Sequence, residues 1–257
     1  PYSKIQQKRD TLKRTLTSSN GRSSYLLANE NATDTAVEAI RALRTNIYFS
    51  MLDAKNNVLM ITGAAPEAGK SFISSNLATV MAQSGKKVLL IDADMRKGYL
   101  EQLFSTHVAP GLSELLSGEA SPVEAVQQTD IENLFFISHG NYTQSSSELL
   151  MNKRLGDLIE QASKRYDYVI IDTPPVLAVT DAAIVGQHVG MTLMVARYGY
   201  TTAQDLDNAA RRLVQSNINI KGVILNGIKR DAFNSYNCYS YGSYTAGSDK
   251  KAAKSKG

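Results

Sequence analysis

A glycine-rich segment early in the chain has the spacing of a phosphate-binding loop. Within residues 63–71, the last eight fit the pattern [AG]-x-x-x-x-G-K-[ST] from Ala64, directly after Gly63, and the segment lies between an apolar run at 58–62 and a helical pattern at 72–84. In such a loop, backbone N–H groups surround a phosphate chain, the lysine reaches the outer phosphates and the last hydroxyl binds Mg²⁺. The residues predicted to contact ATP are Gly63, Ala64, Ala65, Pro66, Glu67, Ala68, Gly69, Lys70, Ser71 and Phe72.

Three aspartates at the ends of predicted strands could supply carboxylates for Mg²⁺ beside the phosphate-binding loop. Asp92 and Asp94 end one apolar run, and Asp172 ends another at 168–172. Because ligands of a parallel α/β sheet bind at the carboxyl ends of its strands, these carboxylates should lie beside the glycine-rich loop. Mg²⁺ prefers hard oxygen ligands, so Ser71 with an aspartate from each of two strands would hold it against phosphate.

The two aspartates on one loop suit phosphoryl transfer to an alcohol or a phenol. A carboxylate beside the attacking oxygen helps to orient it and to take its proton. One of Asp92 and Asp94 would then bind Mg²⁺ while the other faces the acceptor, and the sequence leaves open which does which. Turn capping is the alternative role of this pair, and helix N-capping is the alternative for Asp172.

The elements that must position these residues follow from the hydrophobic pattern. Near-continuous apolar strands alternate with helices, which predicts a mainly parallel sheet with helices on both faces, joined by right-handed crossovers. The predicted fold class is therefore an α/β, P-loop NTPase-like fold. Strands are predicted at 58–62, 88–94, 134–138, 168–172, 191–196 and 222–225, and helices at 35–51, 72–84, 111–116, 147–163, 181–189 and 203–216.

The first predicted helix has an apolar face and a charged face. It opens with a capping box at 35–38, and apolar residues then recur at helical spacing as far as Met51. Glu38, Arg41 and Arg44 lie off the apolar stripe. They can pair with one another along the helix or with charges across a head-to-tail subunit interface.

Composition and charge divide the chain into three parts: a polar linker at 1–33, a folded domain at 34–230 and a flexible tail at 231–257. The formal net charge is +4, but residues 1–22 carry +5 and residues 245–257 carry +3, which leaves the middle acidic. Basic ends predict a solvated tail or a segment near an anionic membrane, and no nucleic-acid partner. The single cysteine, Cys238, excludes an internal disulfide and fits a reducing compartment.

The predicted tail has almost no aliphatic residues but is rich in tyrosine. Four of the 13 tyrosines fall within nine residues. Neither helical nor strand periodicity explains their spacing, and the segment cannot bury enough apolar surface to order itself. Such tyrosines can serve as adaptable contacts for a partner. The four are Tyr236, Tyr239, Tyr241 and Tyr244.

Taken together, the motifs resemble those of the bacterial tyrosine kinases, which are similar to P-loop partitioning ATPases rather than to eukaryotic kinases. The resemblance rests on residues 63–71, the D-x-D-x-R ending of 88–96, the strand end at 171–175 and the tyrosine cluster. It covers roughly residues 34–245. It is strongest to the kinase domain of Wzc-like proteins, which regulate capsule and exopolysaccharide polymerisation and export.

The resemblance implies roles for particular residues. Lys70, Asp92 and Asp94 would be catalytic, and Ser71, Asp94 and Asp172 would form the Mg²⁺ site. Glu38, Arg41 and Arg44 match the family's ring-interface motif. The phosphate acceptors would be Tyr236, Tyr239, Tyr241, Tyr244 and, as an internal site, Tyr99.

The resemblance also implies partners and a location. We expect a ring of like subunits that phosphorylate one another, a cognate tyrosine phosphatase, and the polysaccharide export and polymerisation machinery. The chain would be the cytoplasmic domain of an inner-membrane protein whose membrane segments lie outside this sequence.

Two other functions fit parts of the pattern. A partitioning-type ATPase would only switch conformation, but such proteins usually carry a second lysine early in the loop, where this chain has Ala64 and Ala65. A nucleotide-binding scaffold would use its tyrosines only to bind a partner.

Overall fold

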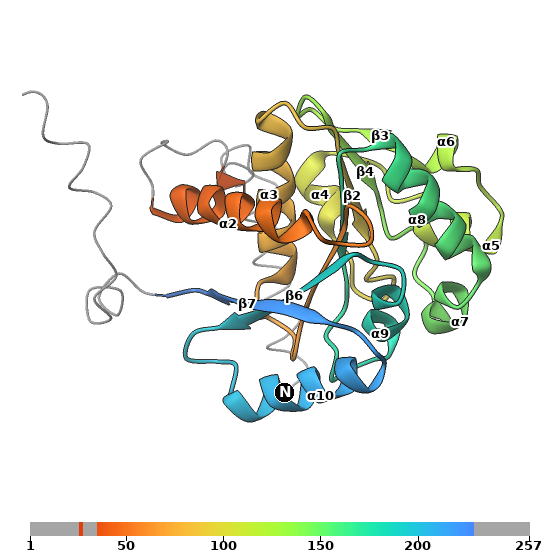
Figure 1. The fold of residues 1–257 in the computed structure, drawn as a ribbon. Coiled ribbons are helices and arrows are strands. Elements are labelled where there is room, and N and C mark those ends of the chain that lie inside the picture. Colours follow the sequence, from red (N-terminus) through yellow and green to blue (C-terminus); the bar gives the residue numbers. More distant parts are fainter. Residues whose placement is uncertain (1–25, 28–34, 229–257) are drawn as a thin grey trace, which may run out of the picture. The chain divides into compact units, whose positions relative to one another are not determined.

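The computed structural model describes residues 26–27 and 35–228 (Figure 1). In this part of the chain, seven strands form one sheet in the order β3-β4-β2-β5-β1-β6-β7. The strand β3 is antiparallel to β4, and every other neighbouring pair is parallel. The strands are β1 (Val58–Gly63), β2 (Val88–Asp92), β3 (Gln127–Gln128), β4 (Leu134–Ile137), β5 (Tyr168–Asp172), β6 (Met191–Arg197) and β7 (Ile220–Asn226).

The helices cover both faces of the sheet. Alternate residues of β1 enter two different hydrophobic clusters, Val58 and Met60 on one face and Leu59 and Ile61 on the other. The helices α2 and α3 pack on the second face, and α8, α9 and α10 on the first. The helices are α2 (Thr35–Met51), α3 (Lys70–Gln83), α4 (Leu100–Phe104), α5 (Leu112–Ser117), α6 (Pro122–Ala125), α7 (Ser146–Leu150), α8 (Lys153–Arg165), α9 (Asp181–Gly186) and α10 (Ala203–Gln215).

The predicted helix at 147–163 is wrong in one respect, because the segment forms two helices. Asn152 separates α7 from α8, and its side chain accepts a hydrogen bond from the N–H of Arg154, which makes it the N-cap of α8. An N-cap residue has non-helical backbone angles, so the helix begins anew at this point. The short elements α4, α6 and β3 were not predicted.

The strand order brings the predicted site residues to one edge. The strand β5 lies between β2 and β1, and Asp92 is opposite Asp172 in the β2–β5 register. The glycine-rich loop leaves the end of β1 on the other side of β5. The predicted meeting of aspartates and phosphate loop at the carboxyl ends of the strands is therefore confirmed.

The described residues include only two of the predicted linker and none of the predicted tail. Within the predicted linker, Leu26 and Leu27 are described and buried, and the N–H of Leu27 donates to Oδ1 of Asn76 in α3 at 2.7 Å. The four tail tyrosines lie outside the described residues. In the part of the chain that is described, no helix has the length and apolar character of a membrane span.

Candidate active site

In the loop between β1 and α3, the backbone at two glycines lies very close to neighbouring residues. Gly69 has a φ of 90°, and a Cβ there would lie 2.0 Å from Nδ2 of Asn226. A Cβ on Gly63 would lie 2.9 Å from the carbonyl oxygen of Val195 and 3.4 Å from the side chain of Lys70. The buried stem of Lys70 therefore runs across Gly63, inside the loop, as a phosphate-binding lysine should.

Asp172 accepts hydrogen bonds from two hydroxyl groups of α3. Ser71 Oγ donates to Oδ2 at 2.6 Å, and Ser74 Oγ donates to Oδ1 at 2.8 Å. The predicted pair of Ser71 and Asp172 is thus in direct contact. Ser74 was not predicted, although its position three residues after Ser71 places both on one helix face.

Burial is the main cause that raises the pKa of both buried carboxylates, Asp92 and Asp172. Burial raises the pKa of Asp172 to about 6, although Lys70 and the two serine hydroxyls oppose the shift. Burial, and then the charges of Asp172 and Asp94, raise the pKa of Asp92 well above its usual range. Because crowded carboxylates favour a bound cation, this site has the charge that Mg²⁺ would neutralise.

The donor set fits Mg²⁺ held together with a nucleotide. The described residues contain no group of three or more His, Cys, Asp or Glu side chains arranged for a metal ion. Mg²⁺ commonly takes one or two carboxylates and completes its shell with phosphate oxygens and waters. Ser71, Asp172 and Asp94 would supply the protein's share.

The segment that follows β2 folds around its own aspartates. Asp92 Oδ1 accepts from the N–H of Asp94 at 3.0 Å, and its Oδ2 accepts from the N–H of Leu100 at 3.3 Å. Asp94 Oδ1 accepts from the N–H groups of Arg96 and Lys97. Both aspartates therefore shape this turn, as the alternative role required, but they differ in exposure. Asp92 is 1% exposed and Asp94 is half-buried.

Tyr99 lies in this segment, directly before α4. It is partly buried, and its carbonyl oxygen accepts from the N–H of Gln102 at 3.1 Å. The next residue, Leu100, contacts Asp92. Tyr99 thus borders the site, and its role as a phosphate acceptor stays a prediction.

Two residues at the ends of β6 and β7 hold the loop from outside. Asn226 Nδ2 donates to the carbonyl oxygen of Ala68 at 3.1 Å, and a guanidinium nitrogen of Arg197 donates to that of Glu67 at 3.2 Å. Neither residue was predicted from the sequence. Their positions at strand ends could have indicated them, because ligands of such a sheet bind at the carboxyl ends of its strands.

Arg96, the last residue of the D-x-D-x-R sequence, is held by a second network. Its Nε lies 3.4 Å from Oδ2 of Asp181 at the start of α9. Asp181 also accepts from Ser146 Oγ at 2.9 Å and from Ser147 Oγ at 2.6 Å. The turn after β2 is thereby joined to α7 and α9.

The predicted interface residues make contacts within this chain. Arg41 pairs with Glu38 one turn earlier on α2. A guanidinium nitrogen of Arg44 lies 3.5 Å from the carbonyl oxygen of Val80 in α3. The local pairing that was the alternative for Glu38 and Arg41 is thus present, and the subunit interface stays a prediction.

Several known proteins are similar to this chain in sequence and in fold. Residues 57–221, more than half of the chain, match the family model described as an AAA domain. The kinase domain of Escherichia coli tyrosine kinase ETK is 50% identical and superposes with a TM-score of 0.77, over 80% of this chain and 81% of that one. The chain belongs to the bacterial tyrosine kinases. The family and the P-loop NTPase-like fold predicted from the motifs are thus confirmed.

Curated relatives in this kinase family are much longer. The tyrosine-protein kinase wzc of Salmonella typhimurium is 49% identical over 251 residues, which cover 98% of this chain and 35% of that protein. A Klebsiella pneumoniae relative, described as a putative tyrosine-protein kinase in the cps region, is 48% identical with the same coverage. The chain therefore spans about a third of the length of the curated relatives it matches.

Proposed function

We propose that this chain is a Mg²⁺- and ATP-dependent kinase domain that phosphorylates protein tyrosines, including those of its own C-terminal segment. The observation that carries the proposal is the contact of Ser71 with Asp172 beside the buried Lys70, at the edge where Asp92 and Asp94 also lie. The 50% identity to the ETK kinase domain favours this function over a partitioning-type ATPase or a scaffold.

Each residue has a distinct task in this proposal. Lys70 neutralises charge on the transferring phosphoryl group, and Ser71, Asp172 and Asp94 hold Mg²⁺. Asp94 is one of the charges that raise the pKa of Asp172, so the two carboxylates act on each other electrostatically at this edge of the sheet. Mg²⁺, when bound, offsets the negative charge of the phosphates.

Asp92 is the proposed base. Its raised pKa makes it a stronger proton acceptor than an ordinary aspartate. It takes the phenolic proton as the tyrosine oxygen bonds to the γ-phosphorus and ADP leaves. Tyr236, Tyr239, Tyr241 and Tyr244 are the proposed acceptors, with Tyr99 as an internal one.

The wider role of the domain follows from the relatives. We propose that it regulates capsule or exopolysaccharide polymerisation and export as the cytoplasmic kinase domain of an inner-membrane protein. Its partners would be further copies in a ring, the export machinery and a tyrosine phosphatase. The Klebsiella pneumoniae relative from a cps region supports this assignment.

Intact-mass measurement after incubation with Mg–ATP tests the reaction. A ladder of phosphate additions, mapped to tyrosines by peptide sequencing, is expected. Release of ADP without additions would instead identify an ATPase switch. Neither product would identify a scaffold and overturn the proposal.

A further inference from the structure

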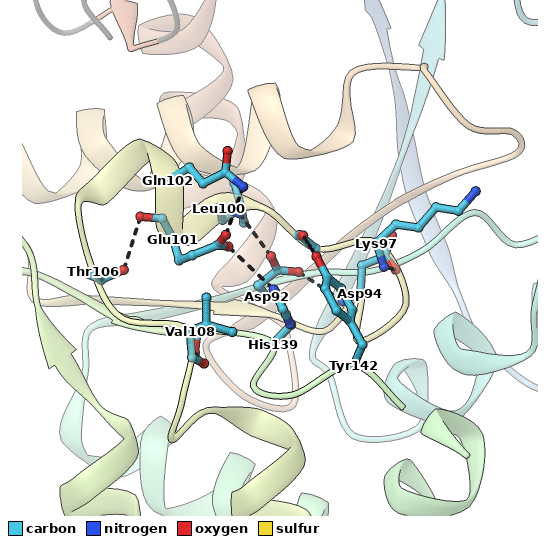
Figure 2. Close-up of polar contacts among 12 residues, drawn as sticks. Asp92, Asp94, Lys97, Leu100, Glu101, Gln102, Thr106, Val108, His139 and Tyr142 are labelled. Carbon is cyan, nitrogen blue, oxygen red and sulfur yellow. Dashed lines mark hydrogen bonds and ion pairs between the residues drawn. The ribbon is translucent and has the colours of Figure 1, made fainter. Parts of the chain in front are cut away.

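A buried histidine and a buried glutamate lie beside the segment that follows β2, and the proposed reaction does not use either of them. His139 follows β4 and is fully buried, and Glu101 is 6% exposed in the first turn of α4. His139 Nε2 lies 3.6 Å from Glu101 Oε2. A dashed line joins the two side chains in Figure 2. Within the described residues, these two atoms and His139 Nδ1 have no hydrogen-bond partner. Because buried polar atoms are nearly always hydrogen-bonded, a pair just short of contact requires an explanation.

Gly98 lies between the side chains of His139 and Asp92. A Cβ built on Gly98 would lie 2.5 Å from Cδ2 of His139 and 2.6 Å from Oδ2 of Asp92. The edge of the imidazole and the carboxylate thus face each other across a residue without a side chain. Any larger residue at this position would push them apart.

Tyr142 covers the imidazole and fixes the same glycine. Its ring stacks on His139 with centroids 4.6 Å apart and an interplanar angle of 19°. Its hydroxyl donates to the carbonyl oxygen of Gly98 at 3.0 Å. Tyr142 is 62% exposed and therefore lies at the surface, where its contacts with His139 and Gly98 hold it in place.

The pair also reaches Asp92 through α4. Asp92 Oδ2 accepts from the N–H of Leu100, and Glu101 is the next residue. A backbone shift at Glu101 would therefore also displace the neighbouring N–H group that orients Asp92. In the segment from Asp92 to Glu101, Gly98 is held by the Tyr142 hydroxyl, and Glu101 at the end faces the histidine.

We propose that Glu101, His139 and Tyr142 are positioning residues that hold the Asp92 carboxylate in the orientation that phosphoryl transfer needs. This inference rests on the proposed function of Asp92. These residues act on the carboxylate and not on the phosphate-binding loop. Their loss therefore slows the reaction at saturating ATP while the affinity for nucleotide stays the same.

The test compares three variants with two controls. Glu101→Gln and His139→Gln should each lower the rate of phosphotyrosine formation at saturating Mg–ATP by about 10- to 100-fold. Tyr142→Phe keeps the ring stack, loses the hydroxyl, and should lower the rate less. The affinity for Mg–ADP, measured by calorimetry, should change less than about twofold. Glu160→Gln on α8 and His188→Gln after α9 should leave rate and affinity unchanged.

Hydrogen exchange measures the positioning directly. In the Mg–ADP complex, the amide of Leu100 should exchange faster in Glu101→Gln and His139→Gln than in the parent chain. This measurement needs no phosphotyrosine. It therefore tests the positioning even if the parent chain shows no kinase activity. Absence of kinase activity would contradict the proposed function but not the positioning.

Three results would overturn the positioning role. One is an unchanged rate in all three variants, the second is an unchanged exchange of Leu100, and the third is an equal fall of rate and nucleotide affinity. The surface variant Tyr142→Phe keeps the test decisive even if a change at the buried positions 101 or 139 prevents folding.

Discussion

Lys70 acts on two groups in the nucleotide site, the phosphates it is proposed to neutralise and the buried Asp172. Lys70→Met should lower phosphotyrosine formation by at least about 100-fold, because one preorganised charge in such a site is worth that much. The thermal melting curve should stay cooperative. The exposed Lys164→Met is the matched control. Undiminished phosphotyrosine in purified Lys70→Met would contradict the assigned role.

The raised pKa of Asp172 predicts that the stability of the ligand-free protein depends on pH. Its folded pKa of about 6 exceeds the ordinary 3.8, so between these values the folded state binds more protons than the unfolded state. Its contribution to the free energy of unfolding therefore falls as pH rises through this window, by on the order of 2–3 kcal/mol at neutral pH.

Asp172→Asn removes this titration, so its melting temperature should rise relative to that of the parent between pH 4 and pH 7. Added Mg–ADP should reduce the difference, since Mg²⁺ favours the ionised carboxylate. If the melting temperatures of Asp172→Asn and the parent differ by the same amount at every pH, Asp172 does not titrate in this window.

At the scale of elements, the turn into α3 can be tested with two glycines of similar backbone. Gly69 and Gly85 both have positive φ, of 90° and 81°, so alanine at either strains the chain by about 1 kcal/mol. A Cβ at position 69 meets Asn226, whereas one at position 85 has nothing within 4 Å. Gly69→Ala should therefore weaken Mg–ADP binding by at least tenfold and Gly85→Ala should not. Equal affinities by calorimetry would refute the close-approach argument.

The sequence predicted elements where the local signal was strong. The regular apolar runs gave β1, β2 and β5, and the strand-end rule placed Asp92 beside Asp172. Asn152 carried a capping signal that competed with a helical pattern continuing on both sides of it.

The sequence pattern does not reveal contacts between segments that are far apart in the chain. Glu101 and His139 are 38 positions apart and belong to different elements, so no periodicity relates them. Their meeting depends on the sheet order, which places β4 next to β2. Alternation of strands and helices indicates a parallel sheet, but it does not say which strands are neighbours.

At the scale of the whole molecule, we predict that one chain phosphorylates another. Lys70→Met with its tail intact should gain phosphotyrosine when it is mixed with an active chain that lacks residues 231–257. Arg41→Ala should reduce this transfer, because its pair with Glu38 is worth only about 0.2–0.5 kcal/mol and can be exchanged for a partner on a neighbour.

Arg211→Ala is the matched control, since Arg211 forms a similar exposed pair with Asp207 on α10. The readout is phosphotyrosine on the inactive chain, separated by mass. No transfer at concentrations where the parent phosphorylates itself would point to a reaction within one chain.

The order of strands also decides when the protein can first bind a nucleotide during its synthesis. The strand β1 pairs with β5 and β6, and Val58 meets Val169, which the ribosome adds 111 residues later. At roughly 5–20 residues per second, β1 waits about 5–20 s for its first neighbour. Throughout that interval the nascent chain carries an apolar strand and a phosphate loop whose neighbouring strands are not yet made. Before β5 and β6 are made, β1 is therefore open to pairing with strands of other chains, and a chaperone that covers it would prevent this.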